Sequence, residues 1–331
     1  MYRNRRFFLK RLIKAGVYAG IMPTVGSILM ESCNNPHNQQ HIFIYGNKKS
    51  AEFYQNVASN FSSISFEEIN LLNRDKKHPV LISMPLDHRG DIAKLALEQG
   101  HSILTEIPPT NEYNIFSKIK QNTDISNVHL GLILFHRYLT ICKKAHEIIQ
   151  RGELGKILSI KVQMGDYKAD PLFNPENGHL QGYLLHMLDL VKWLTSADYT
   201  GLHIIPTSPD QIEISAKAKD FHALFSSVPL KYGICNTFRI NIECEKGELV
   251  LKDAKILTLA SDQELSKVLV NLEAPDYKDA IHNNIYDFLS ANNNKTYNLN
   301  NLTDAFDSIT LKKTIHQAQK TNRYIELNEV T

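Results

Sequence analysis

Residues 79–85 read Pro-Val-Leu-Ile-Ser-Met-Pro, an apolar run enclosed by two prolines. A short continuous apolar run bounded in this way predicts a strand that is buried on both faces. Residues 91–99 follow with helical spacing and end at Gly100, the residue type that most often closes a helix. Residues 102–105 predict the next strand. Strands that alternate with helices indicate a parallel sheet.

The same alternation continues on both sides of this stretch. In this part we further predict strands at 41–45, 63–66 and 129–135, and helices at 50–58 and 113–121. Gly46 ends the first strand, so a glycine stands at the first strand-to-helix turn. We therefore expect a parallel-sheet domain over residues 41–135.

The pattern changes after residue 135. Helices are predicted at 139–151 and 181–195, with a strand at 157–164 between them. A region made mostly of strands follows at 199–259, and two helices at 276–290 and 302–320 close the chain. Strands that follow one another with only turn residues between them favour antiparallel pairing. We therefore expect residues 136–331 to form an α+β domain on a large, mainly antiparallel open sheet.

The N-terminal residues predict an export signal. Residues 5–10 read Arg-Arg-Phe-Phe-Leu-Lys, and an apolar stretch follows at 12–30. This pattern resembles a twin-arginine leader, which directs folded proteins out of the cytoplasm. The alternative is a membrane helix, but Lys14 and several glycines in the stretch make it a poor permanent span. We assign residues 1–33 to the leader and expect a periplasmic or otherwise exported protein.

Two alternatives remain for the end of the leader. Ser32 precedes Cys33 and a polar run at 34–40 follows, as expected for a cysteine that is lipid-modified at the cleavage point. Met30 and Glu31 are irregular for that signal, which leaves cleavage nearby and release as the second alternative. Lipidation of Cys33 would attach the protein to a membrane. In both cases residues 34–40 form a polar linker.

The charge balance argues against a nucleic-acid partner. Of the 37 Lys and Arg side chains, six lie in the leader, as does one of the 35 Asp and Glu side chains. The remaining chain therefore carries 31 basic against 34 acidic groups. Binding to a phosphate backbone requires a positive face. The cysteines and histidines show no metal-ligand spacing, so we predict no metal site.

Several segments together resemble the Gfo/Idh/MocA oxidoreductases. They occur in the family's order at residues 80–85, 92–101, 104–108, 151–157, 186–194 and 245–251. The resemblance implies a Rossmann-like dinucleotide-binding domain at 41–135 and a substrate and oligomerisation domain at 136–331. It also implies NAD or NADP as cofactor, a sugar-like ligand, and homo-oligomers formed through the open sheet face.

The resemblance also implies where the cofactor binds. The glycine-rich phosphate turn corresponds to Gly46, Asn47 and Lys48, although only one glycine is kept and a solvated loop explains the lysine equally well. The other residues that the resemblance places along the cofactor are Met84, Pro85, His88, Glu106, Pro108 and His136.

The segment between Tyr45 and Val80 is shorter than in the family, so one strand of the usual first half is expected to be missing. The acidic residue that would bind the ribose could be Glu67 or Glu68. We interpret these two residues instead as the start of the helix that precedes the strand at 80–83.

The catalytic positions are partly altered. The resemblance identifies His186 as the general base, with Tyr183 and Asp189 on the same helical face. The lysine expected after Glu106 is Ile107, which can donate no hydrogen bond and carries no charge. The aspartate expected four residues before the histidine is Gly182. A helix histidine that only packs is the simpler interpretation of His186.

Two functions remain open at this point. The first is an NAD(P)-dependent oxidoreductase that transfers hydride to or from a sugar or sugar derivative. The second is a non-catalytic relative that keeps the two domains and binds a carbohydrate or acts as a scaffold in the periplasm. The family pattern favours the first function, and the altered residues favour the second.

Overall fold

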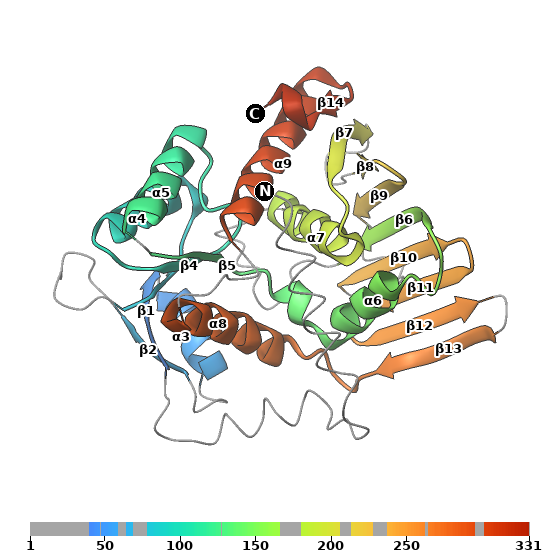
Figure 1. Ribbon diagram of the computed structural model, residues 1–331, viewed down its shortest axis with the longest axis horizontal. Helices are drawn as coiled ribbons and strands as arrows, with labels where there is room; N and C mark the ends of the chain where they lie inside the picture. Colours follow the sequence, from blue (N-terminus) through green and yellow to red (C-terminus); the bar gives the residue numbers. More distant parts are fainter. Residues whose placement is uncertain are drawn as a thin grey trace.

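The computed structural model describes residues 40–46, 48–58, 64–68, 78–126, 128–165, 180–205, 213–227, 237–261, 264–294 and 301–330. Two β-sheets lie side by side, and helices occupy the space between them (Figure 1). The first sheet comes from the N-terminal part of the described chain and the second from the remainder. This is the predicted succession of a parallel sheet and a large, mainly antiparallel one.

The first sheet has five parallel strands in the order β2-β1-β3-β4-β5. Their bounds are Gln40–Gly46 for β1, Ile64–Glu68 for β2, Val80–Ser83 for β3, Ile103–Thr105 for β4 and Leu130–Leu132 for β5. In the usual doubly wound order two strands lie outside the first one. In the part of the chain that is described, only β2 does, which confirms the shortened sheet.

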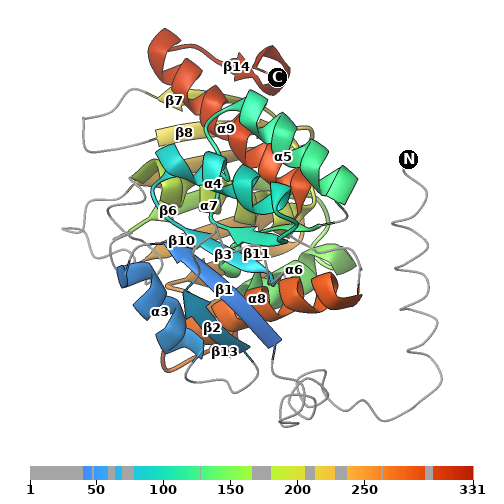
Figure 2. The same cartoon turned by 90° about the vertical axis from the view of Figure 1, so that its left-hand side faces the viewer.

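Helices cover both faces of this sheet. Helix α3 (Lys48–Ala58) and helix α8 (Tyr277–Asn294) lie on one side, and α4 (Leu86–Glu98) and α5 (Tyr113–Ser126) lie on the other (Figure 2). Every residue of β3 is buried as a result. This double coverage is the reason why residues 80–82 are apolar without alternation.

The structure corrects the interpretation of Glu67 and Glu68. They are the last two residues of strand β2, where the sequence favoured the start of a helix. The strand pairs in parallel with β1, with Phe43 opposite Glu67 and Ile44 opposite Glu68. Pairing with a neighbouring strand thus decides the conformation of this segment, which local sequence alone left ambiguous.

The second sheet has nine strands in the order β13-β12-β11-β10-β6-β9-β8-β7-β14. Among the described strands of this sheet, only β6 and β9 pair in parallel. The strands are β6 Ile157–Met164, β7 Tyr199–Ile205, β8 Glu213–Ala218, β9 His222–Ser227, β10 Phe238–Cys244, β11 Gly247–Lys252, β12 Ile256–Ser261, β13 Glu264–Asn271 and β14 Ile325–Glu326. Helices α6 (Thr140–Arg151), α7 (Leu180–Thr195) and α9 (Leu302–Thr321) lie on the side that faces the first sheet (Figure 1).

The two C-terminal helices return to the first sheet. Asn284 of α8 is fully buried. Its Oδ1 accepts from the backbone N–H of Leu134 at 2.7 Å, and its Nδ2 donates to the carbonyl of Leu132 at 3.2 Å. Helix α9 is tied to α5 by the hydroxyl of Tyr113, which lies 3.0 Å from the hydroxyl of Thr310. Helices α8 and α9, which come late in the chain, are therefore hydrogen-bonded to the end of the first sheet and to one of its covering helices.

None of the helices in the described ranges combines the length and the apolar character that crossing a membrane requires.

Candidate functional site

The candidate site lies at the edge where the parallel strands of the first sheet end. Ligands of open parallel sheets bind at the carboxyl ends of the strands. Here that edge contains Gly46 at the end of β1, Ser83 at the end of β3 and Glu106 after β4. The short helix η2 (Phe135–Tyr138) follows β5 and carries His136.

The carboxylate of Glu106 links the end of β4 to helix α4 and to the end of β3. Nη2 of Arg89 on α4 lies 2.5 Å from Oε2 of Glu106, and the hydroxyl of Ser83 donates to Oε1 of the same carboxylate at 2.7 Å. Helix α4 starts at Leu86, earlier than the sequence predicts, with Pro85 as its N-cap. This start places Arg89 in the first turn, on the side toward the sheet. Both carboxylate oxygens of Glu106 are therefore engaged.

Tyr54 of α3 belongs to the same cluster. Its side chain is fully buried, and its pKa is raised well above the ordinary value, first by desolvation and then by the negative charge of Glu106. Arg89 and a hydrogen bond with Ser83 oppose this rise. The phenol is therefore protonated at any physiological pH. Side chains from α3, β3, α4 and the turn after β4 thus meet in one polar cluster.

Ile107 occupies the position where the resemblance places a catalytic lysine. Its side chain is 6% exposed, and the peptide bond to Pro108 is cis. An aliphatic side chain in a buried position can neither donate a hydrogen bond nor carry a charge. The proton chemistry of any reaction at this edge must therefore come from other residues.

Two imidazoles, one on η2 and one on α7, face the site. The ring centroids of His186 on α7 and His136 on η2 are 5.4 Å apart, and Phe135 and Phe238 pack around them. The pKa of His186 lies well below its ordinary value because of desolvation, and secondarily because of His136 and Arg89. The ring is therefore neutral near pH 7. Its Nδ1 atom is buried and has no hydrogen-bond partner among the described residues.

Tyr183 and Asp189 hold helix α7 in place. The hydroxyl of Tyr183 donates to the backbone carbonyl of Thr237 at 3.2 Å. Asp189 accepts from Arg137 through both carboxylate oxygens, one of them at 2.9 Å from Nε. Both side chains therefore hydrogen-bond to other parts of the protein, and these hydrogen bonds orient α7. Their predicted catalytic role stays a prediction.

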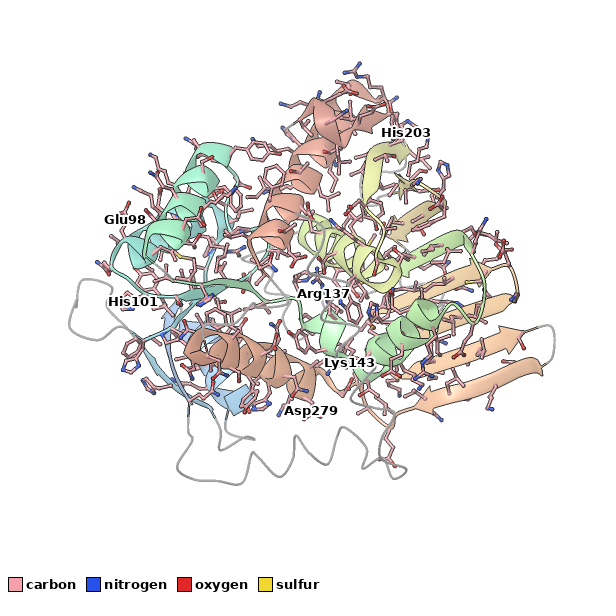
Figure 3. The ribbon with its side chains drawn as sticks, viewed as in Figure 1. Glu98, His101, Arg137, Lys143, His203 and Asp279 are labelled. Atoms are coloured by element: carbon pink, nitrogen blue, oxygen red, sulfur yellow. The ribbon has the colours of Figure 1, made fainter. Side chains whose placement is uncertain are left out.

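Arg137 lies near the centre of the molecule, between the two sheets (Figure 3). Besides Asp189, its Nη2 binds Oδ1 of Asp304 at 2.8 Å. The pKa of Arg137 is raised, because the two carboxylates outweigh the effect of desolvation. This charged triad connects η2, α7 and α9 next to the two imidazoles.

The remaining predicted cofactor residues lie at the same edge or outside the described part. Gly46 is the last residue of β1 and is exposed, and Asn47 lies outside the described residues. Lys48 begins α3, and nothing is described of its side chain. Met84 contributes its carbonyl oxygen, which accepts from Arg89. His88 is exposed on α4.

Arg89, Ser83 and Tyr54 were not assigned to the site from the sequence. Arg89 directly follows His88, which the resemblance places along the cofactor. The structure exposes His88 and buries Arg89, so the neighbouring residue is the one that enters the site. Tyr54 gives no signal in the sequence, because a tyrosine in an amphipathic helix is usually part of the core.

Within the described ranges, no three histidine, cysteine, aspartate or glutamate side chains converge as metal ligands would.

No protein-family model and no curated protein matches the chain. Solved structures do match. An oxidoreductase from Pseudomonas syringae is 13% identical over 88% of this chain and 99% of its own, with a TM-score of 0.74. Levoglucosan dehydrogenase in complex with NADH and L-sorbose has 13% identity, the same two coverages and a TM-score of 0.71.

An oxidoreductase domain protein from Kribbella flavida is 16% identical over 87% of this chain and 90% of its own, with a TM-score of 0.66. These neighbours agree with the resemblance to the Gfo/Idh/MocA proteins. At such low identities the likeness establishes the fold. The chain has the two-domain fold of these oxidoreductases.

Proposed function

We propose that the protein is an oxidoreductase that transfers hydride between NAD or NADP and a sugar or sugar derivative. The observation that supports this most directly is the neutral imidazole of His186, beside the carboxyl edge of the parallel sheet. Its buried Nδ1 atom has no hydrogen-bond partner among the described residues. The fold likeness to levoglucosan dehydrogenase, solved with NADH and L-sorbose, supports the same class of cofactor and substrate.

The described residues at this edge fit a dinucleotide in two respects. Strand β1 ends at Gly46 and α3 begins at Lys48, so a helix N-terminus follows the strand almost at once. Such a terminus suits a pyrophosphate, which Gly46, Asn47 and Lys48 would hold. Glu68 ends β2 beside β1, the place of a carboxylate that binds ribose hydroxyls. When bound, NAD(P) supplies the hydride acceptor or donor.

The chain's own residues supply the proton chemistry. A neutral imidazole can accept the proton of a substrate hydroxyl as the carbonyl forms, and return it in the opposite direction. His186 is the group for this step, and His136 lies next to it. Asp189, held by Arg137, and Tyr183, held by Thr237, fix the helix that carries His186. Glu106, Pro108, Met84 and Pro85 would form the wall beside the cofactor.

One observation favours the alternative of a non-catalytic protein. Ile107 is buried where a lysine would act, so one proton-handling group is absent from the edge. In this alternative the same two domains bind a carbohydrate or another exported protein without turnover.

The deciding experiment releases any bound cofactor from protein purified from its native compartment. We expect the denatured protein to yield NAD(P), detected by mass spectrometry, and the refolded protein to bind NADH in a fluorescence titration. Gly46→Trp should abolish this binding, whereas Asp124→Trp, at an exposed position of α5, should not.

Absence of released cofactor together with no binding of added NADH or NADPH would establish the non-catalytic alternative. If cofactor binds, His186→Ala should remove turnover of the sugar that is the substrate, with the fold intact. Retained turnover would reject His186 as the base.

The proposal includes export through the twin-arginine leader at residues 1–33, followed either by lipidation of Cys33 or by release. The leader lies outside the described residues. The motif at residues 5–10 supports this part of the proposal.

A further inference from the structure

Arg89 uses most of its hydrogen-bonding capacity on one edge of the first sheet. Its side chain is 2% exposed. Nε and Nη2 donate to the carbonyl of Met84 at 3.2 and 2.8 Å, Nη1 donates to the carbonyl of Pro108 at 2.9 Å, and Nη2 also binds Glu106. A guanidinium has five N–H groups in a rigid fork, so this set of partners fixes its plane.

The acceptors belong to two different turns. Met84 lies in the turn between β3 and α4, and Glu106 and Pro108 lie in the turn between β4 and α5. Arg89 therefore binds both neighbours of Ile107 and connects that turn to the preceding one. A single ammonium group could not reach three acceptors with this geometry. The two turns are held in one arrangement by a single side chain.

The charge of Arg89 acts on groups from the second half of the chain. It lowers the pKa of His186 on α7, after desolvation and His136. It also lowers the pKa of Lys312 on α9, after desolvation, and Asp87 opposes that shift. The ammonium of Lys312 donates to Oδ1 of Asn111, in the segment that follows β4. Both helices thus face the edge at which Arg89 is fixed.

We propose that Arg89 is a positioning residue, which fixes the turns after β3 and β4 and provides the fixed positive charge that Ile107 cannot. This inference rests on the proposed function in one respect: these turns are the ones beside which NAD(P) would bind. Arg89 is too deeply buried to touch a substrate. It acts through the shape of the two turns and through its field at His186.

The test must separate this role from simple neutralisation of Glu106. Arg89→Met alone leaves a carboxylate without its partner, which itself destabilises the fold. The double variant Arg89→Met/Glu106→Gln removes both charges and so restores charge balance. Lys94→Met is the matched control, because Lys94 lies on the same helix and forms a partly exposed pair with Glu98.

The first measurement is the affinity for NADH, by fluorescence titration of the folded variants. We expect the double variant to bind roughly tenfold more weakly than the wild type, as expected from the loss of charge-assisted hydrogen bonds that shape the turns. Lys94→Met should bind within about twofold of the wild type, as for other exposed pairs. Wild-type affinity in the double variant would show that Arg89 only balances Glu106, and would overturn the proposal.

The second measurement is the pKa of His186 in the free protein, by NMR titration of its ring. Arg89 lowers the pKa of His186, whereas Glu106 is not among the groups that shift it, so removing both charges favours the imidazolium and we expect the pKa of His186 to rise in the double variant. Lys94→Met should leave it unchanged. If the wild type binds no NADH, the proposed function fails, and this measurement alone decides: a rise supports the role of Arg89 and an unchanged value overturns it.

Discussion

Arg137 on η2 and Asp189 on α7 form a two-point contact, in which the Nε and Nη2 atoms of the guanidinium donate to separate carboxylate oxygens. Planar contacts of this kind are the strongest of the charged hydrogen bonds in proteins. Asp304 binds the same guanidinium from α9. The contact therefore joins the end of the first sheet to two helices of the second half of the chain.

Replacement of Arg137 should be costly to stability. Arg137→Met leaves Asp189 and Asp304 close together and largely buried without a counter-charge, which typically costs about 3–5 kcal/mol. Urea unfolding followed by circular dichroism measures this loss. Arg151→Met is the control, because its side chain is 60% exposed. Adding Asp189→Asn and Asp304→Asn to Arg137→Met should recover part of the loss, and no recovery would show that packing carries the effect.

The low pKa of His186 predicts a pH dependence of stability with a defined sign. The folded pKa lies well below 6.5, and the unfolded chain takes up the proton near 6.5. Below that pH the unfolded state binds more protons, so the free energy of unfolding falls as the pH decreases. The contribution is fully present above about pH 6.5. Urea unfolding at pH 7.5 and 5.5 should show this slope, and His186→Gln should make it smaller.

Three other histidines with lowered pKa values, His129, His146 and His282, add to the same slope. The comparison therefore concerns the change in slope caused by His186→Gln. An identical slope in the wild type and the variant would contradict a depressed pKa at His186.

Two glycines in the turn before β6 predict unequal costs of substitution. Gly152 and Gly155 both have positive φ, of 70° and 77°. A Cβ on Gly152 meets no atom within 4 Å, whereas on Gly155 it would lie 2.6 Å from Oε2 and 3.0 Å from Cβ of Glu245. Both alanine variants carry the backbone strain of the left-handed region. Gly155→Ala should cost about 1–3 kcal/mol more, as overpacking does.

Thermal and urea unfolding of the two alanine variants test this difference directly. Equal losses would show that the segment around Glu245 moves aside at little cost. The Glu245 carboxylate also accepts from the backbone N–H of Lys156 at 2.9 Å, so such a movement would break that hydrogen bond.

The leader predicts a dependence of export on its two arginines. Arg5→Lys/Arg6→Lys keeps the charge but removes the pair that the twin-arginine route recognises. We expect the variant to remain in the cytoplasm, as measured by fractionation and immunoblotting. Lys14→Arg, which alters a basic residue outside the motif, should be exported normally. Export of the double lysine variant would contradict the assignment of the leader.

The sequence predicted the elements whose residues carry a clear local pattern. Residues 80–82 are an unbroken apolar run because two layers of helices cover them, and β3 is buried throughout. Glu67 and Glu68 were misinterpreted because their strand exists through pairing with β1. Local propensity contains no information about that partner.

The candidate site was only partly predictable for a related reason. His186 and Glu106 belong to motifs of the family, so the resemblance identified them. The partners of Asp189 and Glu106 lie on other elements: Arg137 precedes Asp189 by 52 positions, and Arg89 precedes Glu106 by 17. Such contacts follow from the packing of helices against the sheet, which no spacing along the chain reveals.

The carboxamide of Asn284 has a consequence for synthesis of the protein. When the ribosome has completed β5, it has not yet made Asn284. This residue binds the backbone of Leu132, the last residue of β5, and of Leu134, two residues later. Until α8 emerges, the hydrogen bonds of Asn284 to those two peptide groups cannot form, and the edge next to η2 stays unfinished. The nascent first half therefore cannot reach its final state, and only a complete chain presents a finished site.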